Sequence, residues 1–191
     1  MALTVTSAPS VEPITSAEAK EWLRIDTGDS SQDNVLTIEI KAVRQKVENY
    51  LRRALITQTI SFEMNSNDMR DPIEIPRAPV QSITSLTTYD ESGGSETSTV
   101  VTSTKYQLIE GNYLKQRNEG WDINRRDRAG TLVYITGYGD ASTDIPQDII
   151  LVMFELLALR HERRGDEDRD AVTDREAAIL DKIYGYKLNG Y

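Results

Sequence analysis

Few side chains in this sequence could act as nucleophiles or general bases. The chain has one histidine, His161, and no cysteine, which removes most of the nucleophile–base pairs used in covalent catalysis. Glu162 follows the histidine, but no second histidine stands four residues on, as a zinc-binding helix requires. We expect His161 to have a structural role at the C-terminal end of a helix, where the helix dipole favours a charged imidazole.

The other candidate chemical motifs are incomplete. Residues 166–170, DEDRD, lack the spacing and central glycine of a calcium loop, so we expect a solvated loop. Gly137-Tyr138-Gly139 is not the G-x-G-x-x-G of a nucleotide site. Because an acidic protein offers many carboxylate pairs, a metal- or carboxylate-dependent hydrolase using Asp166 or Asp168 stays a remote alternative. We predict no enzyme, no catalytic residue, no metal and no cofactor.

Charge and composition are typical of an ordinary soluble, acidic protein. The net charge is −9, from 31 acidic and 22 basic residues. This balance argues against nonspecific binding of nucleic acid, which depends on neutralising phosphates. An acidic wall around a channel would nevertheless let DNA slide past without binding. The first residues lack the basic and apolar regions of a secretory signal, so we expect synthesis in the cytoplasm.

The candidate motifs lie around one strongly apolar stretch, residues 131–164. It reads as a strand, a Gly-Tyr-Gly turn and the most hydrophobic helix of the chain, which Asp144 is expected to cap. From Ile149 to Leu159 every residue except Glu155 is apolar. A helix that is apolar nearly all round must be surrounded by protein, and eleven residues are too few to cross a bilayer.

Two helices precede this stretch and one follows it. Thr15 and Glu18 form a capping box for the first helix, and apolar residues at spacings of three and four predict a second helix from about 33 to 53. Its basic residues are expected to form a solvated face, with a subunit or phosphate contact as the alternative. Thr173 and Glu176 suggest a capping box for the last helix. The residues expected in the core are Trp22, Val43, Val47, Ile150, Met153, Phe154 and Leu157.

Strand patterns dominate the middle of the chain. From residue 56 the apolar period changes from 3.6 to 2. Residues 90–96, DESGGSE, read as a hairpin tip with a return strand after it. We therefore predict an α+β fold: a small helical bundle, residues 15–55 and 145–184, with a β-rich insertion, residues 56–144, between the second and third helices.

The two ends of the chain suggest contacts with other molecules. Residues 1–14 read as an extended arm, which would fray unless neighbours held it. The last residues, 185–191, are rich in tyrosine and form a plausible docking tail. Packing of this tail against its own domain is the alternative.

Three segments in this order resemble the head–tail connector adaptor proteins, or head-completion proteins, of tailed bacteriophages. They are ALITQTISF, IPRAPVQSITSLTTYDESGG and LVYITGYGD…IPQDIILVMFELLALRHERR. The marks are Pro76, Arg77 and Pro79, the Tyr89-Asp90 approach to a hairpin, and the Gly-Tyr-Gly turn before a proline-started helix. Together they cover roughly residues 15–184, and the residues after Gly165 match least.

The resemblance implies a non-enzymatic part of the virion neck. Such adaptors assemble, commonly as twelve copies, into a ring beneath the portal that extends the DNA channel and carries the stopper or tail. The implied partners are other copies of the chain, the portal protein and a stopper or tail-completion protein, with DNA passing unbound and no membrane. Portal docking would fall to Tyr184, Tyr186, Leu188 and Tyr191.

We expect the hairpin residues Asp90, Glu91 and Glu96 to contact a neighbouring subunit or the tail.

A second function is compatible with the same resemblance. The runner-up function is another neck or tail-side subunit, such as a stopper. The long apolar helix favours the adaptor, because stoppers look mostly β.

Overall fold

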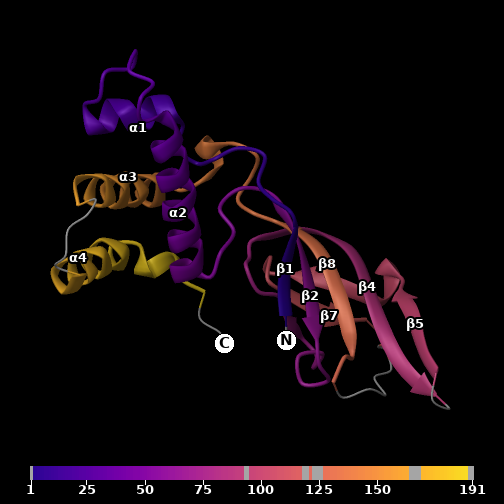
Figure 1. Cartoon of the computed structure of the whole chain (residues 1–191). Coiled ribbons are helices and arrows are strands. Elements are labelled where there is room, and N and C mark those ends of the chain that lie inside the picture. The colour runs from indigo at the N-terminus through magenta and orange to yellow at the C-terminus, as the bar shows by residue number, and fades with distance from the viewer. Residues whose placement is uncertain (1, 93–94, 118–120, 122–126, 164–168, 189–191) are drawn as a thin grey trace. The chain divides into compact units, whose positions relative to one another are not determined.

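The computed structural model describes residues 2–92, 95–117, 121, 127–163 and 169–188, and the chain divides into two compact units (Figure 1). The β unit comprises Met1–Pro9 and Thr57–Gly137, and the helical unit comprises Ser10–Ile56 and Tyr138–Tyr191. Helices and antiparallel sheets therefore occupy separate parts of the chain, which confirms the α+β class.

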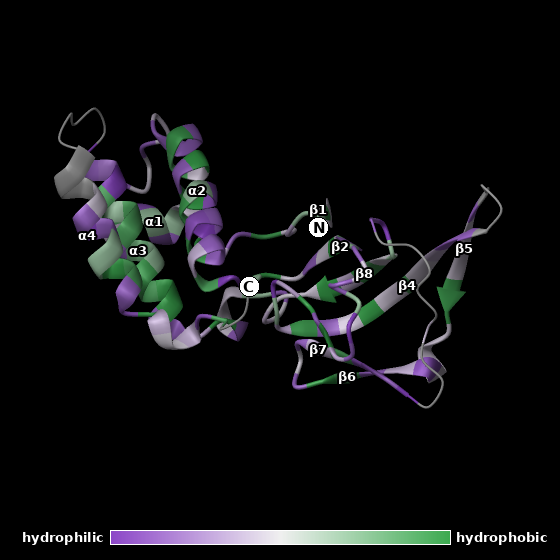
Figure 2. Cartoon of the chain, turned by 90° about the horizontal axis from the view of Figure 1, so that it is seen from below, coloured by the Kyte–Doolittle hydropathy of each residue, from purple (hydrophilic) through white to green (hydrophobic). Residues whose placement is uncertain are grey.

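Four α-helices build the helical unit. Their bounds are α1 Ser16–Leu23, α2 Asp33–Leu51, α3 Gln147–Glu162 and α4 Arg169–Asp181, with short 3₁₀ turns η2 Ser142–Asp144 and η3 Tyr184–Tyr186. Helix α3 contacts α1, α2 and α4, and the hydropathy colours of Figure 2 show that many of its residues are hydrophobic. The three neighbours are the cover that an apolar helix needs.

One expected helix cap is present and two are wrong. The Thr15 amide donates to Glu18 Oε2 at 2.8 Å and the Glu18 amide to Thr15 Oγ1 at 3.2 Å, so the capping box of α1 is confirmed. Helix α3 is capped by Pro146, because Asp144 ends the preceding 3₁₀ turn and accepts from the Ala141 amide. Thr173 lies inside α4, which begins four residues earlier, at Arg169.

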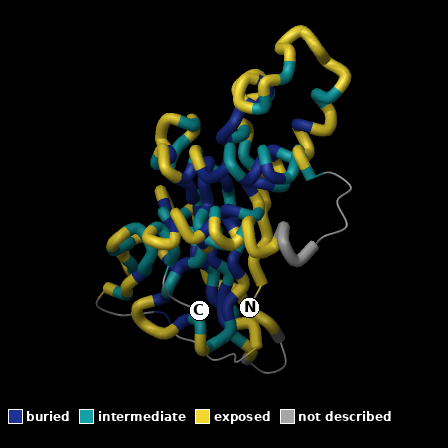
Figure 3. The backbone as a smooth tube through the Cα atoms, turned by 90° about the vertical axis from the view of Figure 1, so that its left-hand side faces the viewer, coloured by how far each residue is buried: buried dark blue, intermediate teal, exposed yellow. Residues whose placement is uncertain are grey.

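The helical core follows the apolar period of α2 and α3. Val43, Val47, Met153 and Leu157 are fully or almost fully buried in one cluster. Ile150 and Phe154 are half-buried at the edge of this cluster. The burial classes of this unit and of the β unit can be followed in Figure 3.

Trp22 lies outside the core, contrary to expectation. Its side chain is 45% exposed and stacks on Phe154 with ring centroids 5.0 Å apart. Helix α1 buries Ala19 and Lys20 instead. The helix is short, so its narrow buried stripe leaves Trp22 on the flank.

The β unit contains two sheets. The five-stranded sheet has the order β1-β2-β8-β4-β5 and the three-stranded sheet the order β3-β7-β6. The strand bounds are β1 Ala2–Ser7, β2 Gln58–Met64, β3 Ile73–Glu74, β4 Val80–Ser92, β5 Ser95–Val101, β6 Tyr106–Ile109, β7 Tyr113–Gln116 and β8 Gly130–Thr136. Side chains from both sheets share one apolar cluster.

The central strand β8 is buried mainly on one face. Leu132 and Tyr134 are fully buried, whereas Val133 and Ile135 between them are half-buried. The Tyr134 hydroxyl donates to the carbonyl of Pro76 at 2.6 Å. This bond ties the strand to the proline-bracketed segment around Arg77, so that segment has a role inside the β unit.

The N-terminal segment is a strand, and its own chain holds it. β1 pairs antiparallel with β2, with Leu3 opposite Phe62 and Val5 opposite Ile60. Residues 2–7 are thus extended, as the sequence indicates, but a neighbouring molecule is not needed to order them. An edge of the sheet supplies the backbone hydrogen bonds instead.

Gly139 is required by a close approach. A Cβ atom at this position would overlap the side chain of Asp144, including its Cβ. Gly137, two residues earlier, has φ +132°, a conformation that favours glycine. The Gly-Tyr-Gly turn therefore uses each glycine for a different reason.

Candidate docking surfaces

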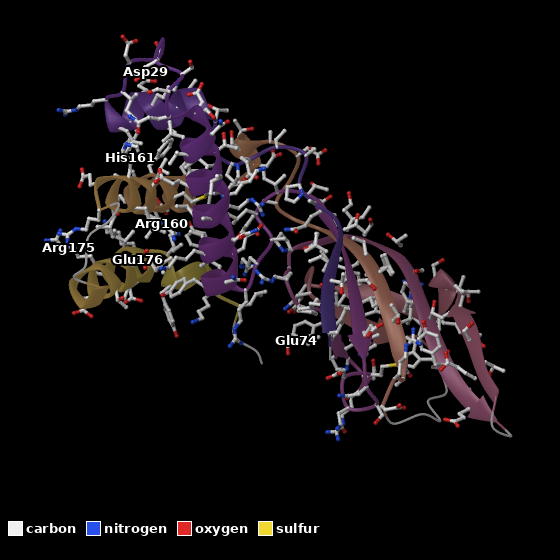
Figure 4. All side chains as sticks on the ribbon, in the orientation of Figure 1. Asp29, Glu74, Arg160, His161, Arg175 and Glu176 are labelled. Carbon is white, nitrogen blue, oxygen red and sulfur yellow. The ribbon has the colours of Figure 1, made fainter. Side chains whose placement is uncertain are left out.

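Exposed side chains in the described part of the chain form several candidate binding surfaces. Among the described residues, no group of three or more His, Asp or Glu side chains could hold a metal ion. His161 Nδ1 lies 3.1 Å from Glu39 Oε2, and this largely buried pair joins the last turn of α3 to α2 (Figure 4). The DEDRD residues 166–168 lie outside the described part. In that part no helix is both long and apolar enough to cross a membrane.

The C-terminal segment folds back onto its own helical unit. Ile183 is fully buried, and the Leu188 amide donates to the Leu51 carbonyl, at the end of α2, at 3.0 Å. The Arg53 guanidinium donates to the Tyr186 carbonyl, and the Tyr186 hydroxyl donates to Asp148 Oδ2 at 3.1 Å. Two of the expected portal-docking residues, Tyr186 and Leu188, thus have contacts within the chain.

The Lys187 ammonium group of this segment lies near two tyrosine rings. Lys187 Nζ lies 4.8 Å from the centroid of the Tyr50 ring and 5.8 Å from that of Tyr184. Burial, and then a hydrogen bond to Asp181, raises the pKa of Tyr50 to about 12. Tyr184 is 59% exposed, which makes it more exposed than the other two expected docking residues that the structure describes, Tyr186 and Leu188. Tyr191 lies outside the described residues.

The acidic hairpin residues lie on strands. β4 and β5 pair from Leu86 opposite Val101 to Ser92 opposite Ser95, with Glu91 directly opposite Glu96. Gly93 and Gly94 between the strands lie outside the described part. Pairing between β4 and β8 ends at Thr88, so residues 89–92 and 95–98 extend past the end of β8 as a two-stranded arm.

Arg128 holds the base of this arm. Its guanidinium lies 4.3 Å from the centroid of the Tyr89 ring and donates to the Tyr89 hydroxyl at 3.3 Å. It also lies 3.6 Å from a carboxylate oxygen of Glu96. The sequence shows a basic loop before β8, but the pairing of Arg128 with residues thirty or more positions away depends on the sheet topology.

An apolar surface lies beside the stacked Trp22 and Phe154 rings. Leu151 on α3 is 47% exposed. A groove of about 480 Å³ begins at Trp22 and continues between α3 and α4, lined by Leu159, Ala178 and Ile179. The Glu155–Lys182 ion pair, 2.6 Å, lies at its margin. The sequence analysis placed Trp22 and Phe154 in the core and expected the apolar helix to be covered on all sides, so it missed this surface.

Comparison with known proteins decides the family. The family model described as the phage gp6-like head-tail connector protein matches residues 14–111, about half of the chain. The chain belongs to the phage gp6-like head-tail connector family.

Solved structures share the connector's fold. A chain in the neck of the empty gene transfer agent (GTA) particle, computed with C6 symmetry, matches with a TM-score of 0.79 at 20% identity. Chains from the native GTA virion and from the native GTA neck, computed with C12 symmetry, match with TM-scores of 0.77 and 0.71 at 20% and 19% identity. Each match covers 100% of this connector and 97% of the other chain. No curated protein sequence matches the connector.

The family and the shared fold confirm the sequence resemblance. A connector is a structural part of the virion, at the junction of head and tail, and this assigns the chain to a structural class. The family model covers α1, α2 and the strands from β2 to β6, and the structural matches extend the likeness over β1, α3 and α4. The segments that carried the resemblance therefore lie in both units of the connector.

Proposed function

We propose that this connector is an adaptor that forms a ring between the portal and the stopper or tail. The observation that carries the proposal is the fold match over the whole chain to proteins of GTA necks. Those necks were computed with C12 and C6 symmetry, and a ring of twelve copies agrees with both. The helical unit, half of the chain, supports an adaptor over a mostly β stopper.

In this proposal DNA passes through the ring without specific binding. A net charge of −9 gives the chain little affinity for phosphates. The ring would be made in the host cytoplasm and act in the virion neck. No catalytic step is needed.

Portal docking is proposed for the C-terminal segment, with Tyr184 as the first contact. Tyr186 and Leu188 bind their own helical unit, so these two and Tyr191 would join the contact only after the segment leaves α2. Aromatic side chains suit such a contact because they bury much area with little loss of rotamer freedom. The acidic arm residues Asp90, Glu91 and Glu96 are proposed to contact a neighbouring copy or the tail.

The test of this function is a reconstruction of the particle neck. Twelve copies in a ring directly against the portal are expected. A ring separated from the portal by another protein would instead identify a stopper-like subunit. A single copy or an open filament would contradict both assignments.

A point substitution tests the docking residue. Tyr184→Ala removes an exposed ring, so the protein should keep its unfolding temperature while binding to portal-bearing heads falls. Tyr184→Phe is the matched control, because it keeps the ring and removes only the hydroxyl. Equal binding by both variants would exclude Tyr184 from the contact.

A further inference from the structure

The five-stranded sheet has two open edges. In the described part of the chain, β1 and β5 are the end strands and each pairs on one side only. A row of unpaired backbone groups on an edge strand is a template for pairing with another chain. Proteins usually protect such edges with charged residues, proline or short strands.

Neither edge carries much protection. β1 has the sequence ALTVTS, with no charge and no proline, and its single irregularity falls between Val5 and Ser7. β5 has the sequence SETSTVV, in which Glu96 is the only charge. All six residues of β1 are exposed. The two strands have similar lengths, six and seven residues.

The apolar face of the sheet ends uncovered at β1. Residues that pair directly with one another form a row across all five strands. The row begins at Leu3 on β1, which pairs with Phe62 on β2, and continues through β8, β4 and β5. The row in order is Leu3, Phe62, Leu132, Leu86 and Val101. Its three middle members are fully buried and Val101 is 7% exposed, but Leu3 is 45% exposed.

The next row repeats this pattern. Val5 pairs with Ile60, which pairs with Tyr134. Ile60 and Tyr134 are buried, whereas Val5 is 52% exposed. Leu3 and Val5 therefore lie on the same face of the sheet as the buried core residues. At the edge strand β1 this apolar face is exposed. A strand added beside β1 would bury both side chains and pair the backbone.

We propose that the open edge of β1 binds the open edge of β5 in a second copy of this connector. The occupant is a second copy because the same sheet presents both halves of the contact. A strand edge that meets a different strand edge makes a head-to-tail contact, and such contacts form a ring when the rotation from copy to copy closes. The inference rests on the proposed ring function and assigns one surface to it.

The topology fixes the direction of this pairing. Four successive antiparallel pairings make β1 and β5 run in the same direction. A cyclic symmetry operation keeps that direction, so β5 of one copy lies parallel to β1 of the next. β5 pairs only with the outer part of β4, from Leu86 to Ser92, so the copies must be staggered along the strands, as in the shear of a closed barrel. An even stagger places Leu3 and Val5 on the face that carries Thr97, Thr99 and Val101.

Cross-linking tests the contact directly, because the natural chain has no cysteine. The full chain with Leu3→Cys and Thr99→Cys is assembled and treated with a short bismaleimide. A ladder of dimers, trimers and higher products is expected from the double variant, and none from either single variant. Ile38→Cys with Thr99→Cys is the control, because Ile38 is 67% exposed on α2. A ladder from that control would overturn the proposal.

Charge substitutions give a second readout. Leu3→Lys and Thr99→Lys should each raise the concentration needed for assembly roughly tenfold, since a charge on an edge strand opposes pairing. Both positions are exposed, so the unfolding temperature should change little. Leu3→Lys combined with Thr99→Glu should restore assembly across a head-to-tail contact. Ile38→Lys is the control and should assemble normally.

The outcomes separate this inference from the proposed function. Native mass measurement of the unmodified chain, alone and on head particles, reports whether a ring forms. Absence of any ring overturns both. A normal ring that gives no ladder and tolerates both lysines overturns the edge contact only. A dimer from Leu3→Cys alone would show β1 meeting β1 around a two-fold axis, which also overturns it.

Discussion

The Tyr186 hydroxyl donates a hydrogen bond to Asp148 at 3.1 Å, which fastens the C-terminal segment to the first turn of α3. Asp148 also lies in the first turn of α3, where the positive end of the helix dipole favours a carboxylate. The hydrogen bond raises the pKa of the Tyr186 phenol. A segment expected to reach another protein is therefore bound to its own helix first.

Tyr186→Phe should loosen this segment without unfolding the protein. The substitution removes one exposed hydrogen bond and keeps the ring. We expect faster hydrogen exchange at the Leu188 amide, which donates to Leu51, and unchanged exchange in α2. Tyr184→Phe is the control, since it removes a hydroxyl from the same turn. Equal exchange in both variants would argue against a fastening role for Asp148.

Stability should fall between pH 10 and pH 12. Burial first, and then the hydrogen bond and charge of Asp181, raise the pKa of Tyr50 from 10.0 to about 12. The folded state thus holds the phenol proton more tightly than the unfolded chain. This contribution is complete below pH 10 and is lost as the pH rises toward 12. Burial raises the pKa of Tyr106 and Tyr138 too, with the same sign.

Urea unfolding at several pH values measures this effect. Tyr50→Phe should flatten the loss of stability in that window, while the tyrosinate absorbance shows which phenols ionise. Tyr113→Phe is the control, because it also removes one phenol, but from the β unit. A wild-type profile that is flat from pH 10 to 12 would contradict the raised pKa values.

Arg44→Met should destabilise the helical unit by about 3 kcal/mol, because it leaves the buried carboxylate of Glu48 and the half-buried carboxylate of Glu12 without their cation. Arg44 Nε donates to Glu12 at 2.7 Å and Nη1 to Glu48 at 2.9 Å, and the Leu55 amide also donates to Glu48. Lys41→Met, at an exposed position of the same helix, is the control. Thermal unfolding measures the effect. Equal unfolding temperatures for the two variants would show that the Arg44 ion pairs contribute little to stability.

Gly139→Ala should destabilise the protein by about 2 kcal/mol, a typical cost of overpacking. The added Cβ would overlap Asp144, whose position is fixed by its bond to the Ala141 amide. Gly185→Ala is a matched control, because nothing lies within 4 Å of its Cβ position. Chemical denaturation measures both. A neutral Gly139→Ala would mean that the η2 turn shifts freely.

Glu91→Lys should weaken assembly while leaving the unfolding temperature nearly unchanged. Glu91 is exposed on the arm, beyond the last pairing of β4 with β8. Surface substitutions of this kind usually change stability by less than about 0.5 kcal/mol. Sedimentation of the assembled protein gives the readout, with Glu63→Lys, exposed on β2, for comparison. If both variants assemble like the natural protein, the arm makes no contact there.

The sequence by itself determined the local elements and the family. Apolar spacing predicts α2 and α3, the Thr15–Glu18 box gives the start of α1, and the DESGGSE stretch marks the β4–β5 hairpin. These signals are local, since each arises from residues within a few positions of one another. The absence of cysteine and the single histidine also restrict the chemistry without any structure.

Tertiary structure decided which apolar residues are covered. Trp22 was expected in the core, yet its side chain is 45% exposed because it lies on the flank of a short helix. Leu3 is also 45% exposed, because it lies on the edge strand of the sheet. The N-terminal strand and the C-terminal segment are held by β2 and by α2, partners about fifty residues or more away in sequence. No local period records such distant contacts, so the sequence shows that a residue is apolar, and only the fold shows which neighbour covers it.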